Sequence, residues 1–156
     1  METNRWDPNS ANKKESEAFE EFVVQKLQPY GYNITLITTT IGQLTIGESV
    51  EGVEIKYDKK SIKSPNIYIE IAEKSNPSNR YYIPSGIYRN DNTNTYVIGN
   101  WNEVWIFDKN YLKEITKNKG ITETPTSQGI LLCKALIETN NKCKHIRFDV
   151  DEFWLK

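Results

Sequence analysis

The 156-residue chain has few of the residues on which thiol, imidazole and zinc chemistry depend: two cysteines, Cys133 and Cys143, and one histidine, His145. Their C-x9-C-x-H spacing matches no familiar zinc pattern, so we expect reduced, unpaired thiols. No nucleophile motif accompanies the histidine, which disfavours hydrolases of the Ser-His and Cys-His classes. Glycine-rich loops of the GxGxxG and GxxxxGK[ST] types are absent as well, which disfavours kinases, NTPases and dinucleotide-binding proteins.

The chain also lacks an excess of positive charge and a long apolar run. Its formal net charge is -1, so it has no overall basic field of the kind that draws many proteins to nucleic acids. A local basic patch or a bound divalent cation can still supply that attraction. No stretch reaches the ~18 to 20 apolar residues that span a bilayer, and METNRWDPNSANKKE lacks the apolar core of a signal peptide. We expect a cytoplasmic protein with no membrane contact.

The residues that are abundant are those of a folded chain. Hydrophobic residues make up 37% of the sequence and aromatic residues 12%, too many for a disordered protein. The length and the absence of repeats or linkers predict a single domain over residues 1–156, with residues 1–9 as a loose N-terminal arm.

Apolar periodicity predicts the order of the elements. Helical spacing predicts helices over residues 10–27 and 109–120, the second capped by Asp108. Residues 130–138 fit either a strand running into a helix or one buried helix. Strands are predicted over residues 33–46, 50–58, 66–74, 95–99, 103–107 and 146–155. We therefore expect an α/β (α+β) sandwich with a mixed central β-sheet flanked by helices.

Two of these strands carry an unusual number of charges. In residues 50–58, Glu54, Lys56 and Asp58 alternate with apolar residues and share one face. In residues 66–74, Tyr68 and Glu70 face away from the isoleucines. A turn joins the two strands, so we expect them to pair, with Glu70 within about 5 to 8 Å of the first polar face. The pattern fits a solvated sheet face or a metal site.

Several carboxylates on one face repel one another unless a positive group lies among them. Hard oxygen ligands with room for water select Mg²⁺ or Mn²⁺. Glu48 precedes Glu54 by six residues, enough chain to fold back and bring a second carboxylate near the first. Lys56 would then orient a water molecule or hold a phosphate.

The segment GESVEGVEIKYD resembles the core of the PD-(D/E)xK nuclease superfamily, in which an acidic residue and a Glu-x-Lys strand build a Mg²⁺ site for phosphodiester hydrolysis. Glu48 would be the first acid, and Glu54-Ile55-Lys56 the Glu-x-Lys motif. In a second alignment, Glu54 or Asp58 is the first acid, Glu70 the second, and Lys56 or Lys74 the lysine. The resemblance covers residues 15–107 and implies a restriction-endonuclease-like core.

The resemblance implies catalytic roles for Glu54, Lys56 and Glu70, and metal ligation by Glu48, Glu54, Glu70 or Asp58. Glu20, on the first predicted helix, and Ser85, in the segment PSGI, would support the site. Nucleic acid would contact a set of basic residues near it: Lys59, Lys60, Lys63 and Arg89.

The function expected from this resemblance is a Mg²⁺- or Mn²⁺-dependent DNA endonuclease of bacterial or phage origin that acts as a homodimer in restriction, junction resolution or recombination. A second interpretation belongs to another class: a catalytically inactive nuclease-like domain that binds nucleic acid or a host protein, for example as an inhibitor. The slight net negative charge and Ala72, where the second alignment calls for lysine, favour this alternative.

Overall fold

Two β-sheets and one long helix position the residues of interest. The computed structural model describes residues 11–138 and 141–148. Its helices are α1 (Ala11–Leu27), α2 (Thr40–Thr45), α3 (Lys109–Thr116) and α4 (Lys134–Glu138), with short 3-10 turns η1 (Gln28–Tyr30), η2 (Lys59–Ile62) and η3 (Gly86–Tyr88). Its strands are β1 (Val53–Tyr57), β2 (Asn66–Glu73), β3 (Ile83–Pro84), β4 (Thr95–Gly99), β5 (Glu103–Asp108), β6 (Thr122–Glu123), β7 (Ser127–Cys133) and β8 (Cys143–Arg147).

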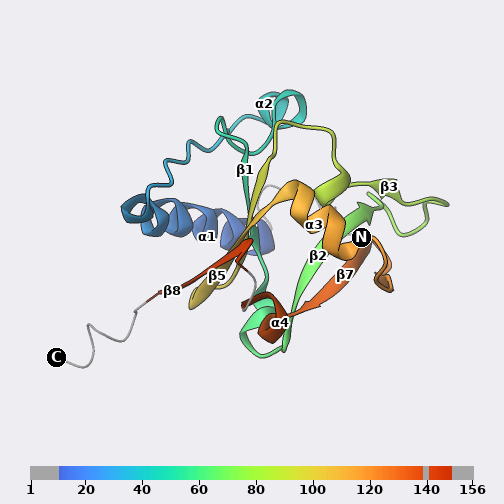
Figure 1. Ribbon diagram of the computed structural model, residues 1–156. Coiled ribbons are helices and arrows are strands. Elements are labelled where there is room, and N and C mark those ends of the chain that lie inside the picture. Colours follow the sequence, from blue (N-terminus) through green and yellow to red (C-terminus); the bar gives the residue numbers. More distant parts are fainter. Residues whose placement is uncertain (1–10, 139–140, 149–156) are drawn as a thin grey trace.

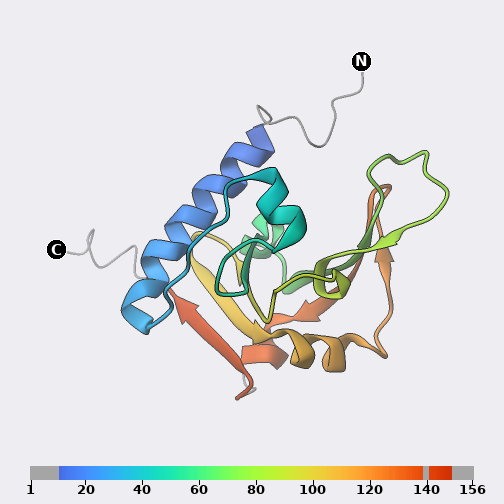
Figure 2. The same ribbon diagram turned by 90° about the horizontal axis from the view of Figure 1, so that it is seen from above.

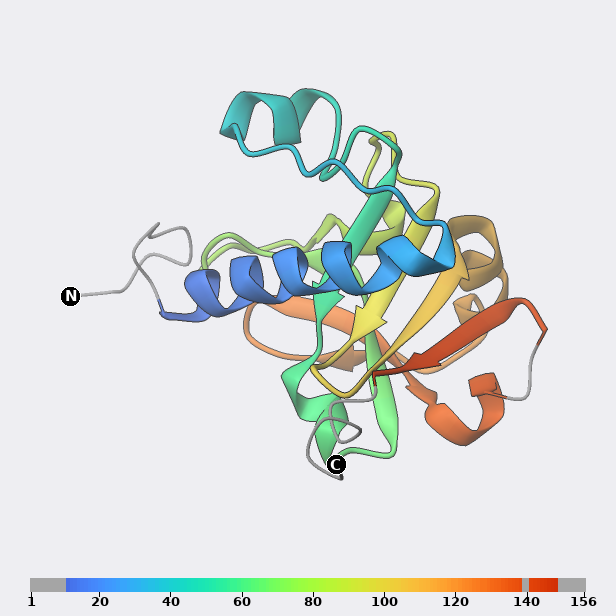
Figure 3. The ribbon, with the colours of Figure 1, turned by 90° about the vertical axis from the view of Figure 1, so that its left-hand side faces the viewer.

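The first sheet is mixed and has the strand order β1-β4-β5-β8. Strand β1 runs parallel to β4, whereas β4, β5 and β8 pair antiparallel. Helix α1 lies across one face of this sheet (Figure 3). Its fully buried residues Phe19, Val23 and Leu27 recur every four positions, so they form one apolar stripe against the sheet. Strand β1 lies at the edge of this sheet.

The second sheet is antiparallel, with the order β3-β2-β7-β6. It packs on the other face of the mixed sheet, where Ile67, Ile69 and Ile130 meet Tyr96 and Trp105. A second hydrophobic core therefore separates the two sheets, and the described chain forms three layers: helix, mixed sheet and antiparallel sheet (Figures 1 and 2).

Several sequence predictions are confirmed. The helix over residues 10–27 and the strands over residues 95–99 and 103–107 are present as α1, β4 and β5. Asp108 caps α3, because its carboxylate accepts hydrogen bonds from the backbone N–H groups of Asn110 and Tyr111. Residues 127–138 form a strand that runs into a helix, the first of the two alternatives.

Three predictions are wrong. The strands over residues 50–58 and 66–74 do not pair, because β1 and β2 belong to different sheets. The described residues form an α+β fold with two four-stranded sheets instead of one central sheet. Residues 33–46 form no regular strand: Leu36 makes an isolated bridge with Ser49, and α2 follows. The Thr39 hydroxyl caps α2 by accepting the Gly42 N–H, a local bond that outweighs the β-branched preference for strand.

The N-terminal arm and most of the last predicted strand lie outside the described residues; Cys143–Arg147 is strand. Among the helices of the described chain, none has the length and apolar character that crossing a membrane requires.

Candidate functional site

Strand β1 carries Glu54 and Lys56 to the edge of the mixed sheet. Residues 53, 55 and 57 point toward α1, so Glu54 and Lys56 point to the side of the second sheet. The Glu54 side chain is only 3% exposed, whereas that of Lys56 is 42% exposed. The Lys56 Nζ atom lies 3.4 Å from Oε1 of Glu54. The charged face predicted for this strand is therefore buried at Glu54 and only partly exposed at Lys56.

The Glu54 carboxyl group is buried without full hydrogen bonding. Burial raises the pKa of Glu54, and attraction to Lys56 opposes that rise. The Tyr96 phenol lies beside this carboxyl group but donates its single hydrogen to the Gly86 carbonyl, at 2.8 Å. Oε2 of Glu54 consequently has no hydrogen-bond partner in the described part of the chain. A buried, unpaired carboxylate oxygen costs free energy, so it marks a position that a cation would stabilise.

Glu20 of α1 contributes a second acid from the opposite side of the sheet edge. Its pKa is raised from 4.5 to about 7, first by burial and then by repulsion from Glu48; attraction to Lys56 acts in the other direction. Glu54 adds a smaller repulsion. Three glutamates from a helix, a loop and a strand therefore lie close enough to perturb one another.

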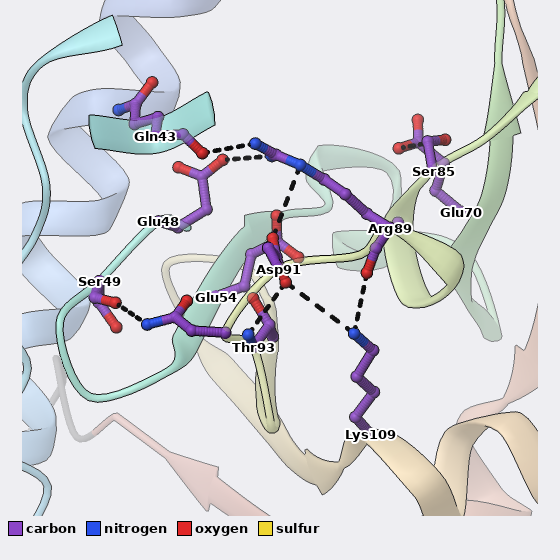
Figure 4. A network of polar contacts seen from close by, with 12 residues as sticks. Gln43, Glu48, Ser49, Glu54, Glu70, Ser85, Arg89, Asp91, Thr93 and Lys109 are labelled. Atoms are coloured by element: carbon purple, nitrogen blue, oxygen red, sulfur yellow. Dashed lines mark hydrogen bonds and ion pairs between the residues drawn. The ribbon is translucent and has the colours of Figure 1, made fainter. Parts of the chain in front are cut away.

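Glu48 is held by an arginine from a distant loop. Nη1 of Arg89 lies 3.4 Å from Oε1 of Glu48, and its Nη2 donates to the Gln43 carbonyl at 2.6 Å. Arg89 was predicted to contact nucleic acid, but its guanidinium points into the acidic group (Figure 4). It neutralises part of the negative charge there instead of extending into solvent.

Asp91 lies beneath this arginine and completes the group. Its side chain is 3% exposed and faces Nε of Arg89 at 3.6 Å and Nζ of Lys109 at 3.9 Å (Figure 4). Oδ1 also accepts the Thr93 N–H at 2.9 Å. The sequence places Asp91 in a polar loop, and nothing in that loop reveals that the aspartate is buried.

Glu70 approaches from the second sheet. It lies at an irregularity of β2, where the pairing with β7 shifts between Glu70 and Ala72. Its Oε2 accepts the hydroxyl of Ser85 at 3.2 Å, and its Oε1 lies 3.5 Å from the hydroxyl of Ser127. Glu70 also raises the pKa of Lys56. Although the predicted hairpin does not exist, packing between the sheets brings Glu70 and Ser85 to the same side of Lys56.

Lys56 is the cation that these acids share. Its pKa is raised, chiefly by Glu54 and further by Glu70 and Glu48, while burial opposes the rise. The side chain therefore stays an ammonium ion at neutral pH. It acts as a charge and a hydrogen-bond donor, not as a base.

Asp58 was predicted to lie on the same polar face as Glu54 and Lys56, but its carboxylate binds backbone groups instead. Its Oδ1 accepts the Ser61 N–H at 3.2 Å and caps η2, and its Oδ2 accepts the Tyr68 N–H at 2.8 Å. Both carboxylate oxygens thus bind backbone groups and tie β1 to β2. We do not include Asp58 among the metal ligands.

The three lysines predicted to attract phosphate lie on η2 or directly after it. Lys59, Lys60 and Lys63 are all exposed, and Lys59 makes one ion pair, 3.4 Å from Oε1 of Glu15. They form a positive rim on the side of β1 where Lys56 emerges.

One group of three potential metal ligands within 4.8 Å of one another is present among the described residues, and it lies elsewhere, at Glu103, Glu138 and His145. Nε2 of His145 lies 2.8 Å from Oε1 of Glu103, and the imidazole ring stacks on Trp105 at 4.9 Å. Cys133 and Cys143 are free thiols and take no part. In the candidate site, Lys56 and Arg89 lie among the acids. No three carboxylate oxygens of its described residues come as close together as the ligand atoms of Glu103, Glu138 and His145.

Comparison with known proteins gives no relative: no family model, no curated protein and no solved structure matches this chain. The chemistry of the site must therefore be argued from its own residues.

Proposed function

We propose that this protein is a metal-dependent endonuclease that hydrolyses phosphodiester bonds in DNA, with the restriction-endonuclease-like arrangement that its PD-(D/E)xK resemblance implies. One observation carries the proposal: the buried Glu54 carboxyl group, with one oxygen that no described residue hydrogen-bonds, lies 3.4 Å from the Lys56 ammonium at a sheet edge. Glu20 and Glu48 add negative charge at the same edge.

The carboxylate chemistry of these residues fits a hard divalent cation, which would draw together oxygens that lie farther apart without it. Carboxylate oxygens are the ligands that Mg²⁺ and Mn²⁺ prefer. One oxygen of Glu54 has no hydrogen-bond partner among the described residues, and the pKa of Glu20 is raised by burial and by repulsion from Glu48. Glu54 and Glu48 would hold the ion, with Glu20 beside them, and Glu70 would reach it from the second sheet. A bound ion of this kind lowers the pKa of a water molecule and offsets charge on a phosphate.

Lys56 has the position of the lysine in the Glu-x-Lys motif. Its partly exposed side chain can donate hydrogen bonds to a phosphate oxygen or to the attacking water, and the ion pair with Glu54 orients its ammonium group. Preorganised charge of this type stabilises the negative charge that develops in a phosphoryl transition state. The exposed lysines of η2 would guide the DNA backbone toward it.

A homodimer is part of the proposal, because two chains with one site each can cut both strands of a duplex. Large apolar side chains between residues 41 and 50 support it, since exposed apolar surface commonly marks a contact with another chain. Four of them are exposed: Ile41, Leu44, Ile46 and Val50. Sedimentation equilibrium would test this part separately, and a monomer at all concentrations would contradict it.

A catalytically inactive binding domain is the second candidate. The position of Arg89 favours it, because this guanidinium already neutralises Glu48 and Asp91. An arginine that permanently replaced the metal ion would leave a stable fold without catalysis.

Incubation of the protein with supercoiled plasmid, single strands and branched junctions tests the proposal. Cleavage should occur with Mg²⁺ or Mn²⁺, stop with EDTA, and disappear in Lys56→Ala. Lys119→Ala is the matched control, since Lys119 is exposed in the turn after α3 and belongs neither to the acidic group nor to the lysines near η2. Cleavage that survives Lys56→Ala, or no cleavage of any substrate with either metal, would overturn the assignment, and the latter result would favour the binding domain.

A further inference from the structure

A cavity of about 620 Å³ opens where the two sheets diverge, directly beside Lys56 and Glu70. Its inner wall is apolar and consists of residues buried between the sheets, among them Ile69, Ile87 and Ile98. This volume lies within the range of about 300 to 1,000 Å³ that is typical of pockets for small molecules and cofactors. Close-packed protein interiors leave few voids larger than a water molecule, so a cavity of this size is not an ordinary packing defect.

An aromatic ring, that of Tyr68, is part of the cavity wall formed by the second sheet. The Tyr68 ring covers Gly129 so closely that a Cβ atom there would lie 2.2 Å from the ring. Its hydroxyl is hydrogen-bonded to Ser127, which also borders the cavity. A glycine at this position therefore lets an aromatic face line a pocket that has hydroxyl groups at its side.

Lysines outnumber acids at the mouth of the cavity. Lys56, Lys59 and Lys60 border it together with Asp58 and Glu70. The oxygens of Asp58 accept backbone N–H groups and those of Glu70 lie against serine hydroxyl groups, so the lysines are the hydrogen-bond donors available to an anion. An anionic group is therefore attracted to the mouth, while an uncharged, flat and partly polar group suits the interior.

A nucleotide has this combination of groups: a phosphate outside and a base inside. A base within a duplex cannot reach such a pocket, because it is stacked and paired, and an enzyme must either take it out of the helix or act where it is already unpaired. Aromatic side chains that receive a base contribute about 1 to 3 kcal/mol per base. Lys56 borders the cavity and belongs to the site, so a base inside places its own phosphate next to the acids.

We infer that the cavity receives one unpaired nucleotide of the DNA substrate, so that the site acts at bulges, flaps, junctions or single strands in preference to uninterrupted duplex. The inference rests on the proposed function and specifies its substrate class. It assigns Tyr68 to nucleotide binding, Gly129 to the positioning of the Tyr68 ring, and Leu131, which is 50% exposed at the cavity border, to the entrance.

Binding measurements on two labelled oligonucleotides test the inference. One is a 20-base-pair duplex, and the other is the same duplex with one unpaired base at its centre; Ca²⁺ replaces Mg²⁺ so that the strands stay intact. The wild-type protein should bind the bulged DNA at least ~10-fold more tightly, in line with the stacking of one base. Equal affinity for the two would overturn the inference.

Variants that fill the cavity sharpen the test. Leu131→Trp and Thr122→Trp both place an indole at the border of the cavity, and either one should remove the ~10-fold preference for the bulge while binding to the duplex stays within twofold. Leu136→Trp is the matched control, because Leu136 is exposed on α4 and does not border the cavity. Thermal unfolding verifies that each variant is folded, and one folded filling variant is sufficient.

The two failures are distinguishable. If the wild-type protein cuts paired duplex and keeps its preference when the cavity is filled, the endonuclease proposal stands and only the nucleotide pocket is wrong. If it binds and cuts no nucleic acid of either kind, the endonuclease proposal fails, and the pocket proposal fails with it.

Discussion

The mixed sheet carries two groups of acidic side chains, and they differ in how far their charge is satisfied. Glu103 makes a 2.8 Å contact with His145, whose ring is fixed on Trp105. Glu54, by contrast, is buried with an oxygen that has no hydrogen-bond partner among the described residues, and burial, followed by repulsion from Glu48, raises the pKa of Glu20. The first group is a hydrogen-bonded pair, whereas the second is the one in which we propose an additional cation. An acidic cluster indicates function when its charges remain uncompensated after folding.

The largest difference that we expect between the Glu54 group and the Glu103 group is in the rate of DNA cleavage when one residue of each is replaced. Lys56→Ala should lower DNA cleavage by about 10² to 10⁴-fold, the range for loss of a positioned catalytic group, because no other described ammonium group lies 3.4 Å from Glu54. His145→Ala should leave cleavage within twofold. Initial rates on supercoiled plasmid with Mg²⁺ would measure both, and equal losses in the two variants would end the distinction.

The pH dependence of stability gives the next largest effect. The folded-state pKa of Glu20 is raised from 4.5 to about 7, so its ionisation lowers the free energy of unfolding as the pH rises through this interval. Glu20→Gln removes this penalty, and its stability advantage over wild type should widen by about 2 kcal/mol between pH 5 and pH 8. Urea unfolding at the two pH values measures the change.

The matched variant is Glu103→Gln, which should gain no stability at pH 8 because it weakens the contact with His145. Added Mg²⁺ should narrow the gap between Glu20→Gln and wild type at pH 8, since the ion compensates the same charge. A gap that is independent of pH would show that Glu20 is not a perturbed acid.

Asp58 provides a satisfied carboxylate close to the site itself. Asp58→Ala should lower the free energy of unfolding by about 1 to 2 kcal/mol, because it removes the cap of η2 and the bond to Tyr68. The same change should leave the affinity for Mg²⁺, measured by calorimetry, within threefold. A large loss of metal affinity would restore Asp58 to the ligand set.

The smallest effect is expected at His145. His145→Ala removes one part-buried hydrogen bond and one ring contact, and we expect a loss of about 1 kcal/mol in the free energy of unfolding. Chemical denaturation at pH 7 measures it. A loss above about 3 kcal/mol, the upper end for a hydrogen bond to a charged group, would show that this group contributes far more than a peripheral ion pair.

Local features were predictable from the sequence, and distant pairings were not. The apolar spacing of α1 and the cap at Asp108 depend on residues within one or two helical turns, so sequence alone identified them. The parallel pairing of β1 with β4 joins residues about 42 positions apart, such as Glu54 and Tyr96, and alternation within one strand does not reveal it. Strands β1 and β2 follow each other in the sequence, so they resembled a hairpin, although they belong to different sheets.

The candidate site shows the same limit. The motif resemblance identified Glu48, Glu54 and Lys56, and it directed attention to Glu20 and Glu70. It did not reveal that Arg89 bonds to Glu48 or that Asp91 is buried under that arginine, because these contacts cross 41 residues of chain or depend on the packing of a loop. An Arg-x-Asp sequence in a polar loop carries no signal that distinguishes a buried ion pair from a solvated one.

Strand β1 packs one face against the core under α1 and turns its other face, with Glu54 and Lys56, toward the second sheet, and this arrangement gives the site a mechanical property. Glu54 and Lys56 move with the mixed sheet, whereas Glu70 moves with the antiparallel sheet, so the spacing between the sheets sets the gap across which these groups act. A substitution such as Ile130→Val, which removes one methyl group deep between the sheets and alters no proposed ligand, should therefore change the width of this gap and the geometry of the site.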